Sequence, residues 1–156
     1  MTLVLRDATT ADAALIAGFV RALAEFEKLA HEAVATDIDF AHAIASEKIA
    51  ALIVEIDEKP VGFALWFHTF STFTGKPGMY LEDLFVLPEH RGHGVGRAIL
   101  RDLARRALAA GCSRLEWSVL DWNLPAVNFY RSIGAMPMDE WTIQRMDRGA
   151  LAALAE

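Results

Sequence analysis

The sequence predicts a mixed α/β domain in which helices cover a sheet. Two observations carry the prediction: several segments place apolar residues at helical spacing, and short apolar runs bounded by turn residues lie between them. The expected order is β-α-α-β-β-β-α-β-α-β, which differs from a series of βαβ units. No internal repeat or linker-like composition appears, so we expect residues 1–156 to form a single domain.

The first half of the chain is expected to hold two helices and three strands. Leu15, Phe19, Leu23 and Phe26 recur at helical spacing and predict one buried helix face. The expected elements are a strand over 3–6, a helix from Thr9 or Thr10 to about residue 30, a helix from Thr36 to about 46, and a hairpin of strands over 49–56 and 61–70.

The second half is expected to begin with the central strand of the sheet, which Pro88 ends. Gly111 should end the long helix that follows, Asn123 should cap a short one, and Asp147 a final one. The expected elements are a loop over 71–78, a strand over 79–87, a helix over 97–110, a strand over 114–119, a helix over 125–134, a strand over 141–146 and a helix after 147.

The composition excludes several classes of function. A formal net charge of −6 argues against a general binder of nucleic acid or of anionic membranes. The single cysteine, Cys112, excludes an intrachain disulfide and a cysteine metal cluster. We expect no signal peptide, no membrane span, no metal site and a cytoplasmic location.

The segment from Tyr80 to Gly96 carries the strongest chemical signal. Three alternating glycines (Gly92, Gly94 and Gly96) precede a predicted helix, where backbone N–H groups and the helix dipole attract anions. A dinucleotide-binding turn fits poorly, because Glu116, twenty residues later, falls inside a predicted strand. A phosphate cradle and a plain loop both remain open at this point.

A second segment carries a family resemblance. Arg91 to Gly96 matches the Q/R-x-x-G-x-G/A motif of the GNAT superfamily of acetyl-CoA-dependent N-acetyltransferases, and Asn123 to Tyr130 with Gly134-Ala135 matches its following motif. The chain most resembles the spermidine/spermine (diamine) and thialysine branch. The resemblance implies a GNAT fold, with a mixed, mostly antiparallel sheet flanked by helices, acetyl-CoA as co-substrate, and a homodimer.

The resemblance also implies where acetyl-CoA binds. The backbone of Leu84 to Val86 should pair with the pantetheine arm, and the glycine loop should hold the pyrophosphate. The residues expected to contact the cofactor are Leu84, Phe85, Val86, Arg91, Gly92, His93, Gly94, Val95, Gly96, Arg97, Asn123, Pro125, Ala126 and Asn128.

The implied catalytic residues are Tyr130, as the general acid beside the leaving thiolate, and Glu82, as the group that binds the amine and helps to deprotonate it. Glu82 and Asp83 are adjacent, so a regular strand would point them to opposite faces, whereas a bulge would bring both near one site. The residues expected to contact the amine substrate are Phe26, Glu27, Glu82, Asp83, Glu116, Asp139 and Trp141.

The chain departs from the branch in the loop before the central strand. Ser71 and Phe73 stand near positions where the polyamine enzymes carry an acid and a tryptophan, and Ile133 stands where a basic residue is expected. A polyamine, a diamine and a thialysine-like amino acid therefore stay open as substrates. The alternatives are a GNAT enzyme that acts on a protein or antibiotic amine, and a non-catalytic sensor of acyl-CoA.

Overall fold

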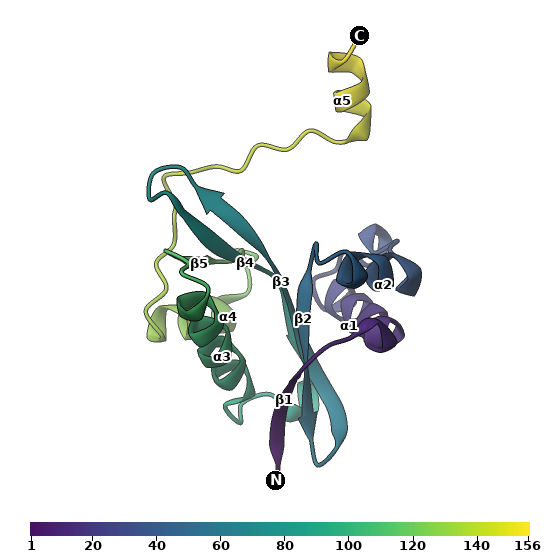
Figure 1. Cartoon of the computed structure of the whole chain (residues 1–156), viewed down its shortest axis with the longest axis vertical. Helices are drawn as coiled ribbons and strands as arrows, with labels where there is room; N and C mark the ends of the chain where they lie inside the picture. The colour runs from purple at the N-terminus through teal and green to yellow at the C-terminus, as the bar shows by residue number, and fades with distance from the viewer. The chain divides into compact units, whose positions relative to one another are not determined.

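The computed structural model describes residues 1–156 and divides into two compact units, 1–118 and 119–156 (Figure 1). The first unit contains a five-stranded sheet in the order β1-β2-β3-β4-β5. Strands β1 to β4 pair antiparallel, and β5 pairs parallel to β4. The strands are β1 Leu3–Asp7, β2 Ala50–Ile56, β3 Lys59–Ser71, β4 Lys76–Val86 and β5 Leu115–Glu116.

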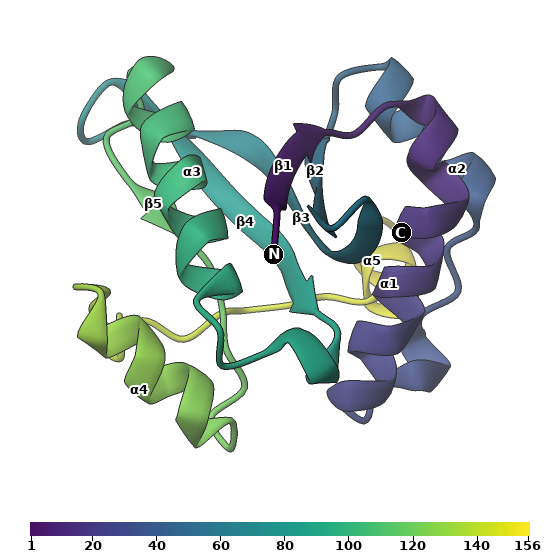
Figure 2. The same ribbon diagram turned by 90° about the horizontal axis from the view of Figure 1, so that it is seen from below.

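Helices of the first unit lie on both faces of this sheet, with α1 and α2 on one face and α3 on the other (Figure 1, Figure 2). The predicted mixed, mostly antiparallel sheet flanked by helices is therefore confirmed. No helix of the chain is long and apolar enough to span a bilayer. The helices are α1 Ala13–Phe26, α2 Asp37–Ala45 and α3 Val95–Ala109, with short 3-10 turns η1 Thr10–Asp12, η2 Ala30–Glu32 and η3 Pro88–His90.

The core on the α1 side of the sheet is built from aromatic and aliphatic side chains. Phe19 of α1 stacks on Phe63 of β3, with 5.5 Å between ring centroids, and lies 6.2 Å from the ring of Phe85 on β4. Ile16 and Phe63 are fully buried in this cluster. The predicted apolar face of the first helix thus fixes α1 against β3 and β4, the strands that carry the site.

Two predicted threonines cap helical segments in the first half of the chain, although Thr9 caps the 3-10 turn that leads into α1 rather than α1 itself. Thr9 and Asp12 form a capping box at η1, and Thr36 and Asp39 form one at α2. In contrast, α1 ends at Phe26, about one turn earlier than predicted. Lys28 adopts a left-handed φ of 61°, and the Leu29 N–H donates to the Ala24 carbonyl at 2.8 Å, which closes the helix without a glycine.

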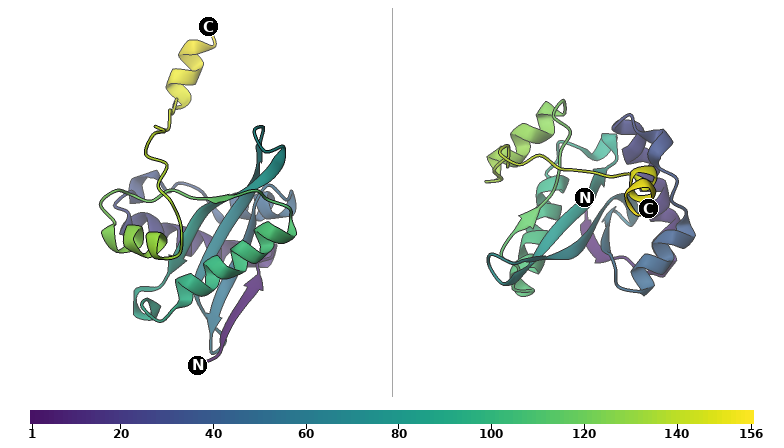
Figure 3. Two further views of the ribbon diagram at one scale, coloured as in Figure 1. Left: turned by 90° about the vertical axis from the view of Figure 1, so that its left-hand side faces the viewer. Right: turned by 90° about the horizontal axis from the view of Figure 1, so that it is seen from above.

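The β3–β4 hairpin is longer than predicted. The predicted loop over 71–78 shrinks to a tight turn, because β3 runs to Ser71 and β4 already begins at Lys76. The buried Ser71 accepts a hydrogen bond from the Thr74 N–H in this turn, and the nearby Phe73 is 98% exposed. The turn of the hairpin extends beyond the helices of the unit (Figure 3).

The second unit contains two helices, α4 Leu124–Ser132 and α5 Arg148–Leu154. Asp147 caps α5 as predicted, since its carboxylate accepts from the Ala150 N–H at 2.9 Å. The strand predicted over 141–146 is wrong: this segment has no regular structure, and Trp141 is 74% exposed. Its alternating pattern suits a strand, but the second unit contains no other strand to pair with it.

Gly62 tests how tightly β3 and β4 approach each other. A Cβ atom at Gly62 would lie 2.5 Å from the Phe85 carbonyl oxygen. We expect Gly62→Ala to lower the free energy of unfolding by about 3 kcal/mol, because the clash is with backbone rather than with a flexible side chain. Urea denaturation measures the change.

Gly18 provides the matched control for that substitution. It lies on the exposed side of α1, and an added Cβ would meet no atom within 4 Å. Gly18→Ala should raise the free energy of unfolding by about 0.5–1 kcal/mol, because alanine loses less backbone entropy in a helix. Equal effects at the two positions would contradict the tight approach of β3 to β4.

Candidate active site

Strand β4 has a strand partner on only one side over most of its length. It pairs with β3 from Lys76 to Val86, but with β5 only at Met79 and Tyr80. The Leu87 N–H donates to the Val61 carbonyl, so residue 87 faces β3. Backbone groups alternate sides along a strand, and those of Leu84 and Val86 therefore face the edge that β5 leaves open.

The glycine loop leads from this edge to the start of α3. Gly92 and Gly94 adopt left-handed φ values of 77° and 80°, and a Cβ atom at either would meet nothing within 4 Å. No side chain caps α3, and its backbone ladder begins with the Ala98 N–H donating to the Gly94 carbonyl. The preceding N–H groups of Val95 and Gly96 are therefore available to an anion such as pyrophosphate.

Arg91 joins the glycine loop to two other elements. Its Nε donates to the Val86 carbonyl at 2.7 Å. Its guanidinium carbon lies 4.8 Å from the ring centroid of Phe26, at the end of α1, and 5.2 Å from that of Phe85 on β4. The predicted cofactor residue Arg91 and the predicted substrate residue Phe26 thus contact each other, which sequence spacing alone did not reveal.

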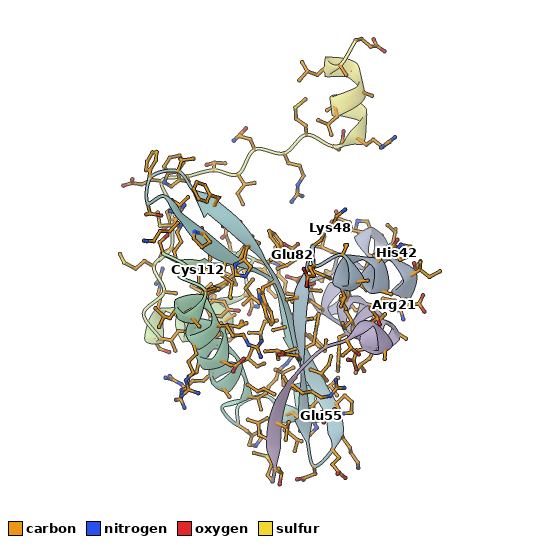
Figure 4. All side chains as sticks on the ribbon, viewed as in Figure 1. Arg21, His42, Lys48, Glu55, Glu82 and Cys112 are labelled. Atoms are coloured by element: carbon orange, nitrogen blue, oxygen red, sulfur yellow. The ribbon has the colours of Figure 1, made fainter.

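A β-bulge lies at Glu82. On β3, Leu65 is opposite Asp83 and its neighbour Trp66 is opposite Leu81, so Glu82 is the extra residue of β4. Glu82 is exposed and Asp83 is half-buried. Figure 4 shows the side chain of Glu82 among those of the sheet and the neighbouring helices. Because the bulge interrupts the alternation of the strand, the two acids no longer have to point to opposite faces.

Glu27 joins these two acids from α1. Burial is the first cause that raises the pKa of Asp83 to about 6, and repulsion from Glu82 and then Glu27 adds to it. Burial also raises the pKa of Glu27. None of the three carboxylates forms an ion pair in the protein. We name Glu27, Glu82 and Asp83 the acid cluster, and its unbalanced negative charge favours a bound cation.

The other predicted residues of the first unit lie outside the acid cluster. Glu116 on β5 forms an ion pair with Arg114 at 3.1 Å, so its charge is already balanced. His93 lines a hollow of about 290 Å³ beside Met1 and Ile56. A larger hollow of about 500 Å³ lies against α1 and contains none of the predicted site residues. The candidate site is therefore defined by the open edge of β4 and the glycine loop rather than by either of these two hollows.

The remaining predicted residues belong to the second unit. Asn123 is the N-cap residue of α4, although its side chain makes no capping bond, and Pro125 lies in the first turn. Tyr130 is half-buried on α4, with its ring 5.7 Å from that of Phe129. The predicted substrate residues Asp139 and Trp141 are exposed in the segment that follows. Ala126 and Asn128 lie on the same helix as Tyr130.

Asp83 should make the stability of the protein depend on pH. The pKa of its carboxyl is about 6 in the folded state and about 3.9 in an unfolded chain, so the folded state binds more protons between these values. Stability is therefore lost as the pH rises from 4 to 6. We expect Asp83→Asn to raise the free energy of unfolding by about 2 kcal/mol at pH 7.5 and to change it little at pH 4.

Urea denaturation at the two pH values measures this difference. Glu25→Gln is the matched control, because Glu25 is exposed on α1 and its substitution should change the free energy of unfolding equally at both. A stabilisation by Asp83→Asn that is as large at pH 4 as at pH 7.5 would contradict the electrostatic explanation.

Comparison with known proteins places this geometry in a family. The model of the "Acetyltransferase (GNAT) family" matches residues 16–135. The chain is 38% identical to thialysine N-epsilon-acetyltransferase from Mus musculus, over 97% of this chain and 96% of that protein. It is 40% identical to L-ornithine N5-acetyltransferase from Arabidopsis thaliana, over 60% of this chain and 41% of that protein.

A solved structure agrees with the fold. An integron cassette protein from the mobile metagenome of V. cholerae superposes with a TM-score of 0.81 at 26% identity, covering 100% of this chain and 99% of that one. The matched family segment includes the bulged strand, the glycine loop and the helix that carries Tyr130. The chain therefore belongs to the GNAT family of acetyltransferases.

Proposed function

We propose that this acetyltransferase moves the acetyl group of acetyl-CoA directly to a primary amine of a small cationic molecule. The observation that carries the proposal is the acid cluster, three carboxylates without a cationic partner, on and beside the strand whose edge is open. An alkylammonium group supplies the missing positive charge, and the strand edge supplies the place for a thioester arm.

The chain's own groups fit acetyl-CoA as co-substrate, which supplies the activated acetyl thioester. The N–H groups of Leu84 and Val86 face the open edge, where they can donate to the pantetheine arm and to the thioester carbonyl. The Val86 carbonyl is already occupied by Arg91. The loop from Gly92 to Gly96 offers N–H groups to the pyrophosphate, as a helix start does for phosphate in general.

On the amine side, the acid cluster attracts and orients the ammonium group. A primary amine with a pKa near that of lysine, about 10, arrives protonated at neutral pH and must lose a proton before it can attack. A carboxylate of the cluster receives that proton, and Glu82 is the group that the family resemblance implies. Tyr130 is the proposed general acid that protonates the departing thiolate.

The β3–β4 turn supports a short amine substrate. Ser71, which replaces an acid of the polyamine enzymes, is 3% exposed and is engaged in the turn. No second carboxylate is therefore offered there to the far end of a long polyamine. Two of the relatives are named for thialysine and ornithine, which are amino acids that carry a side-chain primary amine. A thialysine-like amino acid is the substrate that we favour.

We also propose that residues 1–156 act together as one domain, in the cytoplasm and as a homodimer. The family match runs from residue 16 to 135 and so includes parts of both units. Exposed apolar side chains in the second unit, including Met136, Trp141 and Ile143, support a partner subunit that covers them.

The direct test of the activity is release of CoA thiol from acetyl-CoA with a panel of acceptors. The panel contains thialysine, ornithine, lysine, putrescine, spermidine and an aminoglycoside. We expect thialysine or ornithine to give the highest kcat/KM and spermidine a lower one. Tight CoA binding without thiol release for any acceptor would instead identify a non-catalytic sensor, and preference for the aminoglycoside would identify a different substrate class.

The role of Tyr130 is tested by Tyr130→Phe, which removes only the hydroxyl. We expect kcat to fall about 10²- to 10⁴-fold, because the thiolate then leaves without a proton donor, while the affinity for CoA changes little. Tyr80→Phe is the matched control, since Tyr80 is the other tyrosine of the chain and its hydroxyl bonds to Ser118 at 2.9 Å. Near-normal turnover of Tyr130→Phe would remove Tyr130 from the mechanism.

A further inference from the structure

We propose that Asp83, rather than Glu82, receives the proton of the incoming ammonium group, while Glu82 and Glu27 hold its charge. The inference rests on the proposed function, because it assigns a step of that reaction. The family resemblance implies Glu82 as the base, whereas this inference assigns that role to Asp83. The reasons are the bulge, the difference in burial between the two adjacent acids, and the charges that face each of them.

The bulge gives Glu82 and Asp83 different surroundings. Glu82 is the extra residue without a partner on β3, and its side chain is exposed to water. Asp83 is paired opposite the buried Leu65 and is itself half-buried. A carboxylate that is removed from water holds a proton more firmly, and this applies to Asp83.

Two neighbouring carboxylates act on Asp83 in the same direction. Glu82 approaches from the same strand and Glu27 from the end of α1, and both oppose ionisation of Asp83. The guanidinium of Arg91 packs on the rings of Phe26 and Phe85, and its Nε donates to the Val86 carbonyl, so it forms no ion pair with the acid cluster. The resulting pKa of about 6 leaves Asp83 mostly ionised at pH 7.5, yet more basic than an ordinary aspartate.

The proposed step balances in protons and bonds. The ammonium group gives one proton to a carboxylate oxygen of Asp83, and the freed lone pair attacks the thioester carbonyl carbon. A C–N bond forms, the C–S bond breaks, and the sulfur takes a proton from Tyr130, which is replenished by the second proton of the amine nitrogen. Asp83 then releases its proton to water, so an ammonium and a thioester yield an amide, a thiol and a proton.

The division of roles also accounts for product release. Before the reaction, Glu82 and Glu27 bind a positive charge that offsets their repulsion of Asp83. Acetylation converts the ammonium into a neutral amide, which removes that attraction. The three carboxylates of the acid cluster then repel one another again, because no positive charge lies between them. This repulsion favours replacement of the neutral product by a new ammonium group.

The pH dependence of kcat/KM tests the assignment, because this parameter reports the ionisation of the free enzyme. The acceptor is thialysine, or the best substrate of the panel. For the unaltered protein, kcat/KM should fall tenfold per pH unit below about pH 6. Asp83→Asn should abolish this acid limb and lower kcat about 10²- to 10⁴-fold.

Two further variants separate the base from the groups that bind charge. Glu82→Gln and Glu27→Gln each remove a negative charge that acts on Asp83, so each should move the acid limb to lower pH, raise the KM of the amine and keep kcat within about tenfold. Glu25→Gln, on the exposed side of α1, should leave the limb in place. An acid limb lost in Glu82→Gln, or retained in Asp83→Asn, would overturn the proposal.

These measurements remain decisive if one variant folds poorly. Circular dichroism and CoA binding establish that Asp83→Asn is folded, and the shifts in Glu82→Gln and Glu27→Gln test the assignment without altering Asp83. An unshifted limb in both variants would contradict it. Failure of the proposed function has a different signature, because the unaltered protein would then release no CoA thiol with any amine.

Discussion

The one-sided pairing of β4 is the constraint on which the rest of the site depends. β4 is hydrogen-bonded to β3 along its length but leaves β5 after Tyr80, directly before the bulge at Glu82. A bulge bends a strand and increases its twist, which explains why the two strands separate there. The same extra residue therefore leaves the backbone of Leu84 and Val86 unpaired, where we propose that acetyl-CoA binds, and interrupts the alternation at Glu82 and Asp83, where we propose that the amine binds.

The acid cluster is held together against its own repulsion. The β3–β4 ladder fixes Asp83 opposite Leu65, the left-handed turn at Lys28 ends α1 at Glu27, and the packing of Phe19 on Phe63 holds that helix on the sheet. Burial of like charges lowers stability, and at neutral pH Asp83 carries this cost. The proposed function explains this cost, because a carboxylate that is not already paired can bind and deprotonate a cation.

Local sequence signals predicted the features that depend on local interactions. The capping residues Thr9, Thr36 and Asp147, and the hairpin of β2 and β3, follow from propensity and periodicity. The bulge at Glu82 depends on how β4 pairs with β3, and the strand expected over 141–146 failed because a strand requires a partner that periodicity does not supply. The left-handed conformation of Lys28 could not be predicted, because a glycine is the usual sequence signal for it.

The contacts of Arg91 limit which segments of this enzyme can be exchanged with those of another acyltransferase. In the sequence the glycine loop looks like a segment that could be exchanged on its own. However, Arg91, which directly precedes the loop, packs on Phe26 of α1 and Phe85 of β4 and donates to the Val86 carbonyl. A loop transplanted from another acyltransferase would need the same two rings to receive it. The glycine loop, α1 and β4, which we propose to bind the two substrates, are therefore not independent modules, and substitutions in one constrain the others.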